Sequence, residues 1–72
     1  MNKKNIRYSS HAIQRKLERD ISEEEISETL EYPDYTLSSF ENRKIAVKRI
    51  GEKTVHVVYK EETSYINIIT IY

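Results

Sequence analysis

The chain has 72 residues, no cysteine and a formal net charge of zero at pH 7. This length allows one domain with a small core, because a domain of about 60 residues buries only about 60% of the surface that its unfolded chain exposes. Without cysteine, disulfides and thiolate sites are excluded, so packing or a partner chain must stabilise the fold. No segment resembles a signal peptide or approaches the roughly 18 apolar residues that span a bilayer, so we expect a cytoplasmic protein without membrane contact.

Charges of opposite sign are segregated along the chain. Residues 1–17 hold five basic residues and no acid, beginning with Lys3 and Lys4, whereas residues 18–34 hold eight acids against Arg19 alone. A net charge of zero argues against general affinity for nucleic acid, which usually shows as a basic total. A fold can still gather one sign on one face, and the acidic strip suits a basic partner protein.

Two helices are predicted first. Ser9 or Ser10 can cap a helix over about residues 11–19. Ser22 begins a second helix over about 23–31, since Ser22 and Glu25 form a capping box and Ile21 with Ile26 forms a hydrophobic staple. Pro33 then ends this helix.

The remainder predicts four strands rich in Val, Ile, Tyr and Thr. They cover about residues 35–40, 43–50, 54–60 and 64–71, separated by short breaks that are typical of antiparallel hairpins. The fold class predicted from the residues is therefore α+β, with two N-terminal helices followed by a four-stranded antiparallel sheet, in a single domain over residues 1–72.

The loop at residues 51–53 decides which side chains share a sheet face. A three-residue loop pairs Val47 with Val57 and Lys48 with His56, whereas a two-residue loop sets Val47 against His56. The first register sorts apolar from polar side chains better, so we favour it. It places one apolar face under the helices: Ile45, Val47, Val55, Val57, Tyr59, Ile66 and Ile68. It leaves a half-basic opposite face: Lys44, Ala46, Lys48, His56, Val58, Lys60, Tyr65, Asn67, Ile69 and Ile71.

The first helix carries a basic stripe. At about 100° per residue, Ile13 and Leu17 form its narrow apolar edge, and His11, Arg15 and Arg19 line up on nearly the opposite side. Spacing alone favours a solvated stripe that suits the negative end of the helix dipole. The alternative is a stripe reserved for contact with a ligand.

The run from Ser10 to Ile26 resembles the H-A-x-x-R-x-x-x-R-x-I-S-x-E-E-I opening of a family of small bacterial and archaeal proteins catalogued as a domain of unknown function. Leu30, Pro33 and the closing Thr70-Ile71-Tyr72 continue the match. Residues 42–47 and 55–59 are also similar to BrnT-type toxins of the RelE/ParE-like group. Lys16 and Asp20 depart from the usual residues of the family, and the late arginine of BrnT-type proteins is missing. The resemblance implies a RelE/ParE-like fold and, more weakly, ribonuclease activity.

The resemblance also implies roles for individual residues. Metal-independent RNA cleavage needs a base for the 2′-hydroxyl, an acid for the leaving oxygen and cations for the phosphate. His11 or His56 can serve as base or acid, with Arg15 and Arg19 completing the catalytic set. Lys48 can bind phosphate, and Tyr65 or Tyr72 can stack on an unpaired base. A joint site requires the N-terminus of the first helix to lie near the rim of the sheet.

Three hypotheses follow. The first is an endoribonuclease of a toxin–antitoxin type system, held in check by an antitoxin-like protein. The second is a non-catalytic module that binds nucleic acid, with RNA as its partner, or protein. The third is a structural or dimerising domain that buries the half-basic sheet face in a homodimer. No cofactor is expected, and two lone histidines without cysteine predict no metal site.

Overall fold

A computed structural model describes residues 5–72, so Lys3 and Lys4 lie outside the described residues. The elements are β1 (Asn5–Tyr8), α1 (Ser10–Glu18), α2 (Glu23–Glu31), β2 (Tyr35–Ser38), β3 (Lys44–Ile50), β4 (Lys53–Glu61) and β5 (Tyr65–Ile71). Within the described part of the chain, neither helix has the length and apolar character needed to cross a membrane.

The sheet has five strands in the order β1-β5-β4-β3-β2 and is mixed. Strand β1 pairs parallel to β5, with Ile6 opposite Ile66 and Tyr8 opposite Ile68, while the other neighbours are antiparallel. The predicted fold class, two helices followed by a four-stranded antiparallel sheet, is therefore wrong. The missed strand precedes the helices and is short, and its pairing partner lies 60 residues later in the chain, where local patterns give no signal.

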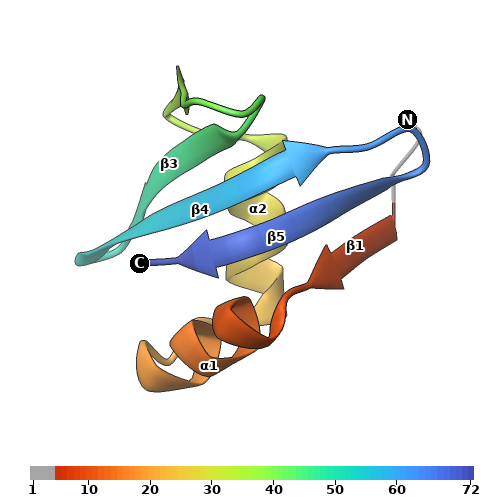
Figure 1. Ribbon diagram of the computed structural model, residues 1–72. Coiled ribbons are helices and arrows are strands. Elements are labelled where there is room, and N and C mark those ends of the chain that lie inside the picture. The colour runs from red at the N-terminus through yellow and green to blue at the C-terminus, as the bar shows by residue number, and fades with distance from the viewer. Residues whose placement is uncertain (1–4) are drawn as a thin grey trace.

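Both helices pack on one face of the sheet, and Figure 1 shows α2 crossing behind β4 and β5. The core lies between these layers. It combines both helices with β4 and β5, and its buried residues are Ala12, Ile21, Ile26, Val55, Val57, Ile68 and Ile71. The opposite face of the sheet carries neither helix.

The predicted helices agree with the structure at their starts. The Ser9 hydroxyl accepts from the backbone N–H of Ala12 at 3.0 Å and begins α1. Ser22 and Glu25 form the expected capping box, with reciprocal bonds of 3.0 and 3.1 Å. Local capping residues were sufficient to predict both helix starts, because each cap and its hydrogen-bond partner lie within one helical turn.

The rotation of α1 differs from the prediction. Ile13 and Leu17, the expected apolar edge, are 49% and 72% exposed, and the buried residue of this helix is Ala12. The helix follows directly from β1 and contacts β1 and β5. At this close approach the sheet accepts the small Ala12 side chain, so Ile13 and Leu17 turn to solvent.

The register of the β3–β4 hairpin also corrects the prediction. Ile50 pairs with Lys53 across the two-residue turn Gly51-Glu52, and Val47 lies opposite His56. Gly51 has φ +63°, which suits a two-residue hairpin turn with glycine first. The slip moves Ile45 and Val47 away from the helices, and it moves Lys44, Ala46 and Lys48 to the helix side. Ile71, expected on the uncovered face, is in the core. The predicted register assumed that apolar side chains are buried only on the face under the helices. Val47 is only 2% exposed although it lies on the face without helices.

Replacing Glu41 with glycine should stabilise the protein. Glu41 and Asn42 form the β2–β3 turn with φ +62° and +61°, a region that costs an ordinary L-residue about 1–2 kcal/mol. Part of that gain is offset by the extra freedom of glycine in the unfolded chain, so we expect about 0.5–1 kcal/mol in urea unfolding. Glu52→Gly is the matched control, because Glu52 is not among the described residues with positive φ. An equal gain in both variants would contradict this interpretation.

The capping box predicts a pH dependence. The backbone N–H of Ser22 and the ammonium of Lys53 hold the pKa of Glu25 below its usual value. Since this pKa is lower in the folded chain, the stabilisation is present at neutral pH and is lost as the pH falls below about 4.5. Glu25→Gln should therefore lower the unfolding midpoint at pH 7 but leave it unchanged in strong acid. Glu24→Gln, in the same helical turn, is the control, and a pH-independent loss in Glu25→Gln would refute the linkage.

Candidate functional site

The face of the sheet without helices is termed the open face. Alternation along the paired strands places these residues on it: Asn5, Arg7, Tyr35, Leu37, Ile45, Val47, Arg49, Thr54, His56, Val58, Lys60, Tyr65, Asn67 and Thr70. These strand positions include two arginines and a lysine but no acid. The open face is therefore basic although the whole chain is neutral.

One ring stack and one cation–π contact lie on strand β5 or at its end. Tyr72 pairs with His56 through backbone bonds of 2.9 and 3.0 Å, and their rings stack with centroids 4.6 Å apart and an angle of 8°. Toward the other end, the Arg7 guanidinium lies 4.3 Å above the ring of Tyr65. Flat aromatic and guanidinium surfaces of this kind are the ones on which unpaired bases stack.

Helix α1 lies at the edge of the sheet. The backbone N–H of Ser9 donates to the carbonyl of Ile68 at 3.0 Å, and its hydroxyl donates to that of Ile69 at 2.8 Å. From this point α1 runs below the last part of β5 toward the C-terminus (Figure 1). The N-terminus of the helix is thus beside β5 at the point where β1 ends. Helix α1 lies on the helix side of the sheet, whereas the His56–Tyr72 stack lies on the open face at the end of the same strand.

The side chains of the basic stripe on α1 contact one another along the helix. The Nε–H of Arg15 donates to Nε2 of His11 at 3.5 Å, and the Arg15 guanidinium also lies 3.6 Å from a Glu18 oxygen. With Ala12 in the core, His11 and Arg15 lie on the flank of the helix opposite to Ile13. Arg19, one turn further on, caps the helix by donating its backbone N–H to the Arg15 carbonyl and is exposed.

The predicted site residues do not form one cluster. His56 and Tyr72 stack at the C-terminal end of β5. His11 and Arg15 lie on α1, which is attached to the same strand through Ser9. These four residues are termed the β5 corner. Tyr65 lies at the opposite end of this strand. Lys48 is on the helix side, where its ammonium donates to the Tyr32 carbonyl at 2.9 Å and is 3.9 and 4.0 Å from Glu28 and Asp34. Lys48 therefore ties α2 to β3 and is separated from the open face.

Arg7 was missed by sequence reasoning. Its only sequence signal was a position between Ile6 and Tyr8 in a four-residue alternation, too short to identify a strand. Tyr8 and Tyr59 have shifted pKa values, but both belong to the core rather than to the candidate site. Burial, reinforced by nearby Glu23 and Glu61 respectively, raises the pKa of Tyr8 and of Tyr59, and both pack against the core.

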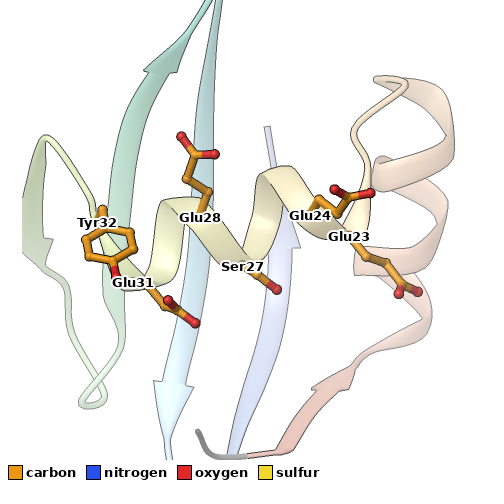
Figure 2. A pocket seen from close by; sticks show the side chains of 6 residues that line it. All are labelled: Glu23, Glu24, Ser27, Glu28, Glu31 and Tyr32. Atoms are coloured by element: carbon orange, nitrogen blue, oxygen red, sulfur yellow. The ribbon is translucent and has the colours of Figure 1, made fainter. Parts of the chain in front are cut away.

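Acidic side chains gather on α2, away from the open face. Figure 2 shows a shallow groove on this helix, lined by Glu23, Glu24, Ser27, Glu28, Glu31 and Tyr32. Such a surface repels phosphate, so an anionic ligand is directed to the other side of the molecule. Among residues 5–72, no group of three histidine, aspartate or glutamate side chains is placed to hold a metal ion.

Lys48→Met should lower stability without affecting any activity of the open face. The variant leaves the Tyr32 carbonyl without its charged donor, which we expect to cost about 1–2 kcal/mol. Lys60→Met, on the open face, is the control and should change the unfolding free energy by less than about 0.5 kcal/mol. Thermal or urea unfolding measures both, and equal stability of the two variants would contradict the structural role of Lys48.

No curated protein and no solved structure matches the chain. A family model does match, over residues 8–72, which include α1, α2, β2 to β5 and every residue of the β5 corner. The family is described as Domain of unknown function (DUF4258). Since the match covers nearly the whole chain, the protein belongs to this family.

Proposed function

We propose that the protein is a metal-independent endoribonuclease, related to RelE/BrnT-like toxins, whose reaction site is the β5 corner. The observation that carries the proposal is the position of α1, which lies along the same end of β5 as the stacked His56 and Tyr72. We infer that an RNA strand at this end of β5 can reach His56 on the open face and His11 and Arg15 on the adjoining helix α1. The resemblance to toxins held in check by a partner protein supports the same reading.

The hydrogen bonds of the two histidines support a different proposed role for each. Nδ1 of His56 lies 3.3 Å from the Tyr72 carbonyl, which can only accept, so Nδ1 carries the proton and Nε2 is the lone-pair nitrogen. His56 is thus suited to remove a proton from the ribose 2′-hydroxyl. His11 accepts from Arg15 at Nε2 and is therefore neutral in this arrangement. It would release Arg15 and take up a second proton from solvent to act, as an imidazolium, as the acid for the leaving oxygen.

The reaction follows from these roles. His56 takes the 2′-hydroxyl proton, the 2′-oxygen attacks phosphorus, and the bond to the 5′-oxygen breaks as His11 protonates that oxygen. The products are a 2′,3′-cyclic phosphate and a free 5′-hydroxyl. Arg15 would leave Glu18 to stabilise the charge that develops on the phosphate, for which its planar guanidinium is suited.

A non-catalytic module that binds single-stranded RNA is the second candidate. The observation that favours it is the open face itself, because a ring stack, a cation–π pair and cations without neighbouring acids are sufficient for binding without any reaction.

Purified protein should cleave single-stranded RNA in the presence of EDTA and leave 2′,3′-cyclic phosphate ends. His56→Ala and His11→Ala should each reduce the rate by about 10²–10⁴-fold, the usual contribution of a general acid or base. Leu17→Ala is the control, since Leu17 is 72% exposed on the other flank of α1. Intact RNA at a large excess of protein would refute the proposal, and salt-sensitive binding without cleavage would establish the second candidate instead.

A further inference from the structure

We propose that Arg7 and Tyr65 form a stacking subsite for an unpaired nucleobase, so that the ligand is single-stranded RNA lying along β5 and reaching several nucleotides from the β5 corner. This rests on the proposed function for the reaction at the corner, while the subsite itself requires only binding.

The geometry of the pair gives the first argument. Arg7 is exposed, and its guanidinium covers the Tyr65 ring at 4.3 Å. Within residues 5–72, Arg7 makes no ion pair, although arginines elsewhere do, such as Arg15 with Glu18. A guanidinium that lies over a ring and makes no ion pair can stack on a base with its outer surface and donate to a phosphate with its edge.

The position of the pair gives the second argument. Tyr65 and Tyr72 are seven residues apart in the chain, about 23 Å at roughly 3.3 Å per residue. Lys60 and Asn67 are paired across β4 and β5 between these two tyrosines. A strand of RNA that stacks at both ends would therefore pass over a lysine, which can neutralise its backbone.

The chemistry of the face selects single strands. Stacking on Arg7 or on Tyr72 needs a base that is not already paired, and A-form duplexes do not present their base faces. The acidic groove on α2 lies away from this path and disfavours wrapping of the strand around the molecule. The Arg7–Tyr65 contact could also serve only to hold β1 against β5. In that case loss of either side chain should leave RNA binding unchanged, whereas a stacking subsite requires that binding weakens.

Fluorescence anisotropy with a 2′-O-methyl oligoribonucleotide of about 10 nucleotides tests the subsite, because such a probe binds but cannot form the attacking 2′-alkoxide. Tyr65→Leu and Arg7→Gln should each weaken binding at least about fivefold, the lower limit for the loss of one base stack. Tyr65→Phe keeps the ring and should bind like the original protein. Tyr32→Leu, on the acidic side, is the matched control and should also be unchanged.

Cleavage assays separate this inference from the proposed function. For long RNA, Tyr65→Leu should raise KM and leave kcat unchanged, while cleavage of a dinucleotide should be the same with and without Tyr65. Loss of probe binding in Tyr65→Leu without any cleavage by the original protein would support the subsite and overturn the endoribonuclease. Normal binding by Tyr65→Leu and Arg7→Gln, in protein that cleaves RNA, would overturn the subsite alone. Absence of salt-sensitive probe binding by the original protein would overturn it as well.

Discussion

The arrangement of this domain depends on Ser9. Its backbone N–H and its hydroxyl donate to the carbonyls of Ile68 and Ile69, and the same hydroxyl accepts from the backbone N–H of Ala12. One residue therefore ends the β1 pairing, begins α1 and attaches both to β5. The irregularity between β4 and β5 is part of this connection, because pairing passes from Ile68 to Thr70 and leaves Ile69 as the extra residue. Its carbonyl is the one that the Ser9 hydroxyl reaches, so the bulge and the helix start satisfy each other.

This attachment has consequences for the surface. With Ala12 directed into the core, α1 presents Ile13 and Leu17 to solvent and keeps His11 and Arg15 on its other flank. Judged by its own apolar edge, the helix would instead turn Ile13 and Leu17 toward the core. The contacts of α1 with β5 and β1 outweigh that preference, and the residue of α1 that they bury is Ala12.

Charge separation is the second organising feature. Helix α2 contributes five glutamates on the side of the helices, while the open-face strand positions hold no acid. Lys48 and Lys53 fasten this acidic layer to β3 and β4 through Glu28 and Glu25. The cations on the open face therefore do not form ion pairs with the glutamates of α2. A chain with zero net charge obtains in this way one face that attracts anions and another that repels them.

The sequence by itself determined the features whose partners are close in the chain. Ser22 and Glu25 specified the start of α2, Pro33 its end, and the turn residues the hairpins of β2 to β5, because each involves neighbours within a few residues. It also placed His11 and Arg15 on one stripe of α1. The presence of β1, the rotation of α1 and the face occupied by Lys48 and Val47 were decided only by the tertiary structure. The first two depend on pairing and packing between residues far apart in the chain. The last depends on a one-residue choice of register at Gly51, which changes the face of every side chain on β3.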